Sequence, residues 1–216
     1  MISNNLKKRL YTSIALLLLV LLIFNSKLIL TYCLIILGVL SILEFLNISK
    51  IIFKSKIILI LLNFFFASYI FIFCFFFLYF SNYEMFKLIL FIILLGCVAS
   101  DIGGFVFGKF FKGPKITKIS PNKTYSGAFG SIIFSSAVVS FLFFYFSRLF
   151  NLDIIILAII ISIFSQLGDL LFSLLKRKAK LKDTGNFLPG HGGVLDRLDG
   201  ILLGSPIGIL TLVLLH

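Results

Sequence analysis

Apolar stretches of about twenty residues recur along this 216-residue chain, of which 60% is hydrophobic. A helix needs roughly 20 apolar residues to cross a bilayer, and backbone shielded from water must close its hydrogen bonds within itself. We therefore expect an all-α, polytopic membrane helical bundle of about seven transmembrane helices. The expected spans are residues 10–24, 28–46, 57–80, 86–107, 128–146, 154–175 and 200–215.

The net charge of +12 is carried by clusters between the expected spans rather than by one soluble face. With seven spans and the N-terminus inside, seventeen of the twenty Lys and Arg residues fall on one side. This asymmetry follows the positive-inside rule and orients the helices. We expect an integral membrane protein with the basic loops on the cytoplasmic side, and no nucleic-acid partner.

Charged residues gather in one 27-residue run, SLLKRKAKLKDTGNFLPGHGGVLDRLD, from Ser173 to Asp199. It holds three of the eight acidic residues, six of the twenty basic residues and one of the two histidines. Long ordered loops on one face of a bundle usually carry function. We expect residues 1–99 to be scaffold helices, in which Glu44 is an isolated polar group. Residues 100–216 should form a catalytic membrane region with two cytoplasmic loops.

Four polar residues share one face near the end of the sixth expected span: Gln166, Asp169, Ser173 and Lys176, spaced by three, four and three. A carboxylate inside a membrane costs about 2.5–3.5 kcal/mol and needs a partner. That partner is either a nearby lysine, which gives a structural ion pair, or a metal ion. Asp169 is therefore a candidate functional group.

The polar run closes with the glycine-rich residues 190–193, which precede Asp196 and Asp199. Glycines let backbone amides approach an anion. Two carboxylates three residues apart suit Mg²⁺, which is usually bound by carboxylates together with substrate phosphates. Their alternative role is to cap the last helix, especially for Asp199. For His191, a catalytic role and a hydrogen bond to loop backbone are equally compatible with the sequence.

A second polar loop follows Asp101, at the end of the fourth expected span, and contains Lys123. Asp101 is another acid near the inner membrane face. Lys123 is a candidate phosphate contact, although a lysine in such a loop is also a topology signal. Gly104 and Gly108 have the spacing of helix-packing residues. The chain contains no GxxxxGK[ST] sequence, which disfavours a P-loop enzyme.

Many positions of the polar run match one known signature. They are Ser173, Lys176-Arg177, Lys182-Asp183, Gly185, Leu188-Pro189, His191-Gly192-Gly193, Asp196-Arg197 and Asp199. In these positions the chain closely resembles phosphatidate cytidylyltransferases, also called CDP-diacylglycerol synthases. Ser100-Asp101 and residues 119–124 are similar to the family's upstream motifs. Two features depart from the family pattern: the chain is short, and Tyr125-Ser126-Gly127 stands where an aromatic residue, Glu and Gly are usual.

The resemblance implies transfer of a cytidylyl group from CTP to phosphatidate, giving CDP-diacylglycerol and pyrophosphate, with one or two Mg²⁺ ions. Its implied partners are CTP, phosphatidate and the lipid of a bacterial cytoplasmic membrane, and a homodimer is left open. It implies catalytic roles for Asp169, Lys176, Asp196 and His191, substrate binding by Asp101, Lys123, Ser173, Arg177, Lys182, Asp183 and Arg197, and metal binding by Asp169, Asp196 and Asp199.

Two other functions are weighed against this one. An ion or solute transporter would line its path with Asp101 and Asp169, but it predicts broken helices in two related halves, and the sequence shows no such repeat. A related CTP-dependent transferase would use an ether-lipid acceptor. Nothing in the sequence separates that acceptor from phosphatidate, so comparing turnover on the two lipids would decide.

Overall fold

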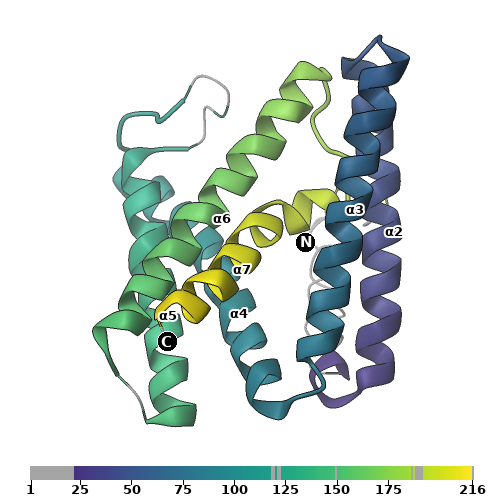
Figure 1. Ribbon diagram of the computed structural model, residues 1–216. Coiled ribbons are helices and arrows are strands. Elements are labelled where there is room, and N and C mark those ends of the chain that lie inside the picture. Colours follow the sequence, from purple (N-terminus) through teal and green to yellow (C-terminus); the bar gives the residue numbers. More distant parts are fainter. Residues whose placement is uncertain are drawn as a thin grey trace, which may run out of the picture. The chain divides into compact units, whose positions relative to one another are not determined.

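The computed structural model describes residues 22–117, 120, 123–148, 150–185, 187 and 192–215. These residues are mostly helical, which confirms the expected all-α class (Figure 1). The helices of the described residues are α2 Lys27–Ile52, α3 Lys56–Phe80, α4 Glu84–Phe111, α5 Tyr125–Ser147, α6 Leu152–Lys178 and α7 Leu195–Leu215. Each is long and apolar enough to cross a membrane. The first expected span, residues 10–24, lies almost entirely outside the described residues.

The last two helices extend beyond the apolar stretches that predicted them. α6 continues to Lys178, and α7 begins at Leu195 rather than at residue 200. Backbone hydrogen bonding can continue past the hydrocarbon, because polar side chains at a helix end reach the membrane surface. Asp196 and Asp199 therefore lie in the first turns of α7, whereas the sequence had placed them in the loop before it.

Contacts divide the chain into two compact units. One holds the residues up to Ser81 together with Leu175–Arg197, and the other holds Asn82–Leu174 together with Leu198–His216. The expected division at residue 100 concerned roles rather than contacts, and it stays a prediction.

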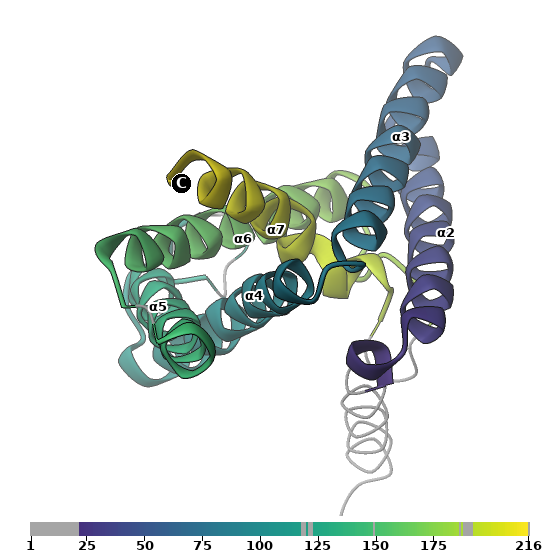
Figure 2. The ribbon, with the colours of Figure 1, turned by 60° about the horizontal axis from the view of Figure 1, so that its bottom comes forward.

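In the first unit, α2 packs along α3 (Figures 1 and 2). Ser49 of α2 donates a hydrogen bond of 2.9 Å to Asn63 Oδ1 of α3. Within α3 only Ile70 and Phe77 are buried. A helix that is apolar all round and so largely uncovered is suited to a lipid surrounding.

In the second unit, the core is formed where α4, α5 and α6 meet. Ile93, Val139 and Ile161, one from each helix, are fully buried there. Partly buried side chains of α7, including Ile209, pack against this cluster. The cluster holds together the helices that carry Asp101 and Asp169.

Small residues allow the helices of the second unit to approach closely. A Cβ atom at Gly104 of α4 would come within 2.6 Å of Ser131 Oγ on α5, which confirms the predicted packing role. At Gly168 of α6 a Cβ would meet the backbone carbonyl of Asp199 on α7. α6 and α7 are therefore in backbone contact beside Asp169.

Candidate active site

The loop between α4 and α5 folds back on itself and so positions Lys123. Ile116 N donates to Lys123 O at 2.9 Å, and Tyr125 N donates to Pro114 O at 3.0 Å. An isolated antiparallel bridge lies between these two hydrogen bonds. The backbone on either side of Lys123 is thus paired, which holds the lysine just before the first turn of α5.

Thr124 caps α5: its side chain accepts a hydrogen bond of 3.1 Å from Gly127 N. Such a cap stabilises a helix by about 1 kcal/mol. Ser126, which stands where the resembling family has Glu, lies 3.0 Å from Thr124 Oγ1 and accepts from Gly113 N at 3.3 Å. At this position the chain has a hydroxyl that binds its own loop instead of a carboxylate.

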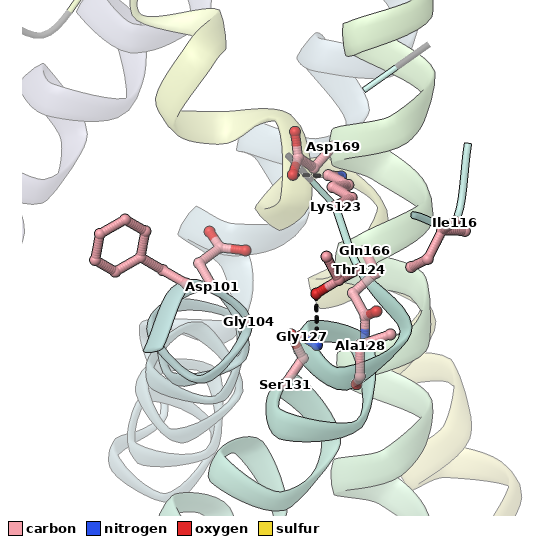
Figure 3. A pocket seen from close by; sticks show the side chains of 11 residues that line it. Asp101, Gly104, Ile116, Lys123, Thr124, Gly127, Ala128, Ser131, Gln166 and Asp169 are labelled. Atoms are coloured by element: carbon pink, nitrogen blue, oxygen red, sulfur yellow. Dashed lines mark hydrogen bonds and ion pairs between the residues drawn. The ribbon is translucent and has the colours of Figure 1, made fainter. Parts of the chain in front are cut away.

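Lys123 forms an ion pair with Asp169 of α6, in which Nζ lies 2.5 Å from Oδ2 (Figure 3). Ser173, one turn further along α6, donates to Asp169 Oδ1 at 3.3 Å. The Asp169 side chain is 33% exposed, whereas Lys123 Nζ itself is buried, so the pair is open to solvent on the carboxylate side. The lysine partner that the sequence allowed for Asp169 is therefore present, and Ser173 lies beside the acid as its spacing predicted.

A pocket of about 210 Å³ opens beside this ion pair, among α4, α5 and α6 (Figure 3). Asp101 of α4, Lys123 of the loop and Asp169 of α6 all line it. Gln166 also lines it, and its amide donates to Ala128 O at 3.4 Å. The structure thus brings these three predicted site residues to one cavity at the end of the apolar helices, although Asp101 and Asp169 lie 68 positions apart in the chain.

The end of α6 turns the chain sharply through a Schellman motif. Leu181 N donates to Lys176 O at 2.9 Å, and Lys180 N donates to Arg177 O at 3.0 Å. Lys180 adopts the left-handed conformation that this motif requires, with φ of 57°. The turn starts the return of the chain toward α7.

Asp196, in the first turn of α7, is held by three donors. Its Oδ1 accepts from Lys176 Nζ at 2.6 Å, and its Oδ2 accepts from Thr184 N at 2.8 Å and from Gly193 N at 3.0 Å. The Lys176 and Asp196 side chains are only 14% and 8% exposed. Buried charges persist where they are paired and hydrogen-bonded, and this pair meets both conditions.

Glu44 of α2 joins the same loop, which the sequence did not predict. It is 1% exposed and accepts hydrogen bonds from Thr184 Oγ1, Val194 N and Leu195 N. Its interpretation as an isolated polar group is wrong. The only available signal was a lone carboxylate within a predicted membrane span, since such residues are expensive and need a partner.

The remaining predicted residues belong to neither ion pair. Asp199 is 7% exposed, and its Oδ1 accepts from Gly200 N at 2.8 Å. His191 lies outside the described residues. Four predicted substrate-binding side chains are exposed at the end of α6, in the following loop and in the first turn of α7: Arg177, Lys182, Asp183 and Arg197.

The described residues contain no cluster of three or more His, Cys, Asp or Glu side chains that could hold a metal ion by themselves. Mg²⁺ does not require such a cluster, because it usually keeps several waters and takes one or two carboxylates plus substrate phosphates. Asp101 and Asp169 line one pocket, and carboxylates are the ligand type that Mg²⁺ takes.

The chain is similar in sequence to known proteins. The model of the cytidylyltransferase family matches residues 9–215. Phosphatidate cytidylyltransferase of Helicobacter pylori (strain ATCC 700392 / 26695) is 40% identical over 137 residues, which are 60% of this chain and 49% of the relative. That of Staphylococcus haemolyticus is 43% identical over 112 residues, 50% of this chain and 42% of the relative. That of Rickettsia felis is 38% identical over 128 residues, 54% of this chain and 56% of the relative.

The chain spans about half the length of the curated relatives it matches. The family model, in contrast, matches nearly all of this chain, including Lys123, Asp169, Lys176 and Asp196. The chain is a helical membrane protein that belongs to the cytidylyltransferase family.

Proposed function

We propose that this chain transfers the cytidylyl group of CTP to phosphatidate, giving CDP-diacylglycerol and pyrophosphate. The observation that carries the proposal is that each unit has a lysine–carboxylate pair toward the end of an apolar helix, Lys176–Asp196 in the first and Lys123–Asp169 in the second. A reaction between a polyanionic nucleotide and a membrane lipid needs such charged groups at the membrane surface. The names of the similar proteins support the same reaction.

In this reaction, a phosphate oxygen of phosphatidate bonds to the α-phosphorus of CTP. The bond between that phosphorus and the oxygen bridging to the β-phosphate breaks, and its electron pair leaves with pyrophosphate. The attacking oxygen is already anionic, so neither a covalent intermediate on a side chain nor a general base is needed. The protein contributes alignment of the two phosphates and neutralisation of their charge.

Mg²⁺ is the proposed cofactor, as one or two ions, and it would supply charge stabilisation for the attacking and leaving oxygens. Asp169 and Asp196 fit as ligands because each already holds one cationic group through a carboxylate oxygen. Asp101, at the pocket of Asp169, would add a further oxygen donor. Asp199 is the third proposed ligand; it is 7% exposed, and its Oδ1 accepts a hydrogen bond from Gly200 N.

Lys123 and Lys176 would bind phosphate once a metal ion takes their place on the carboxylates. A lysine suits this exchange because its ammonium is a compact charge on a flexible stem. The exposed side chains of Arg177, Lys182 and Arg197 would bind further phosphate oxygens. The pocket beside Lys123, at about 210 Å³, is smaller than the roughly 300–1,000 Å³ of typical ligand sites, so it would receive part of the nucleotide.

We place these residues on the cytoplasmic side, where CTP is available, because the basic loops are gathered on one side of the expected spans. Phosphatidate would enter from the same leaflet. Pairing of two chains is a separate prediction, which the mass of the purified protein in detergent tests.

The proposal is tested by pyrophosphate release from CTP by the purified protein in detergent, with Mg²⁺ and phosphatidate. Release should require all three components and should fall at least about 100-fold in Asp169→Asn, a loss within the range for charge-stabilising groups. Lys178→Met, a change of an exposed lysine in the last turn of α6, is the matched control and should retain activity. An ether-linked acceptor in a parallel reaction identifies the lipid. Undiminished release by Asp169→Asn would refute the metal assignment.

A further inference from the structure

Glu44 takes no part in the proposed chemistry, yet its carboxylate is fully enclosed. Oε2 accepts from Thr184 Oγ1 and from Leu195 N, both at 2.8 Å, and Oε1 accepts from Val194 N at 2.9 Å. A carboxylate withdrawn from water is unfavourable unless its oxygens find donors. Here three donors come from one segment, residues 184–195.

Two of these donors belong to the beginning of α7. The first amides of a helix have no partner within it, and the N-terminal end of a helix favours negative charge. Glu44 therefore caps α7 from a different helix, α2. Its third contact, with Thr184, fixes the other end of the same segment, so that one side chain holds both ends of the loop.

The backbone held by Glu44 is also the backbone that holds Asp196. The hydroxyl of Thr184 donates a hydrogen bond to Glu44, and the amide of Thr184 donates one to Asp196. The amide of Gly193 donates a hydrogen bond to Asp196, and the amide of the next residue, Val194, donates one to Glu44. The fit is tight, because a Cβ atom at Gly193 would come within 2.6 Å of Glu44 Oε2. A displacement of Glu44 would therefore move the donors that orient Asp196.

We propose that Glu44 is a positioning residue, which sets the place of Asp196 by holding both ends of the 184–195 segment. The inference rests on the proposed cytidylyl transfer, in which Asp196 binds a metal ion. Glu44 acts only through Thr184, Val194 and Leu195. Its loss should alter kcat and the Mg²⁺ requirement of the folded enzyme.

The first test needs no enzymatic activity: hydrogen exchange of the full chain in detergent, followed by mass spectrometry of peptides that cover residues 184–195. Glu44→Gln keeps the size of the side chain but turns one acceptor into a donor facing other donors. Exchange in this segment should accelerate by about tenfold or more. Ser41→Ala is the matched control, because Ser41 is fully buried on α2 and its hydroxyl bonds only its own helix, at Leu37 O. Wild-type exchange in Glu44→Gln would overturn the inference.

The second test separates positioning from stability. Glu44→Gln and Thr184→Val, which loses the hydroxyl donor, should each lower kcat or metal affinity by about 10- to 100-fold, as outer-shell changes do. Thr184→Ser keeps the hydroxyl donor, so its kcat and metal affinity should stay close to those of the wild type. The double variant Glu44→Gln/Thr184→Val should lose little more activity than either single variant. If Glu44→Gln lowers only the yield of folded protein, with kcat and Mg²⁺ requirement unchanged, positioning is excluded. If the wild type transfers no cytidylyl group, the proposed function fails, while hydrogen exchange still decides whether Glu44 holds the segment.

Discussion

Removing the ammonium group of Lys176 should reveal the cost of leaving a buried carboxylate without its partner. Lys176 Nζ lies 2.6 Å from Asp196 Oδ1, in a pair whose side chains are 14% and 8% exposed. Removing one member of a buried pair costs about 3–5 kcal/mol. Asp196 Oδ2 keeps its hydrogen bonds from two backbone amides, so Lys176→Met should lower the unfolding free energy by an amount at the lower end of this range, about 3 kcal/mol. For a chain of this size the unfolding midpoint should fall by about 6–12 °C.

The measurement is thermal unfolding followed by circular dichroism in one detergent, for the single variants and for Lys176→Met/Asp196→Asn. The double variant has no unpaired charge, so its loss should be smaller than the sum of the two single losses by at least about 1 kcal/mol. Lys178→Met, at an exposed site in the same helical turn, should stay within about 0.5 kcal/mol of wild type. Equal losses for the two lysine variants, or strict additivity in the cycle, would refute the reasoning.

Three further changes test other contacts. Asp169→Asn, besides lowering transfer, should lower the unfolding free energy by about 1–3 kcal/mol, measured by thermal unfolding, because Lys123 Nζ is buried and loses its charged partner. A larger loss would make that pair structural. Gly168→Ala places a methyl group against the backbone carbonyl of Asp199 and should cost about 1–3 kcal/mol in the same assay; an unchanged midpoint would show that α6 and α7 are not in close contact. Thr124→Ala removes the cap of α5 and should lower the midpoint by about 2–4 °C, whereas Thr124→Ser should not.

The helices could be predicted from the sequence because membrane-spanning backbone leaves few alternatives to an apolar helix. The pairing of Ser173 with Asp169 was also predictable, since both lie on one helix at a spacing of four. The starting point of α7 was not. The helix begins where backbone amides donate hydrogen bonds to Glu44 and to the Asp196 carboxylate, and hydropathy reveals neither contact.

The anchoring role of Glu44 is beyond sequence reasoning because its partners are distant in the chain. The contacts with Val194 and Leu195 span 150 and 151 positions, and local spacing rules extend over only a few residues. The ion pair of Lys123 with Asp169 is similar: both residues were candidates, but the fold of the α4–α5 loop determines that they meet.

The most direct test of the central claim follows the two ends of CTP separately. The purified protein is incubated with phosphatidate, Mg²⁺ and CTP labelled with ³²P at either the α- or the γ-phosphate, and the lipid is then extracted. We predict that the α-label enters the lipid and that the γ-label is released as pyrophosphate. Transfer of the γ-label to lipid, or no label in lipid from either substrate, would contradict cytidylyl transfer.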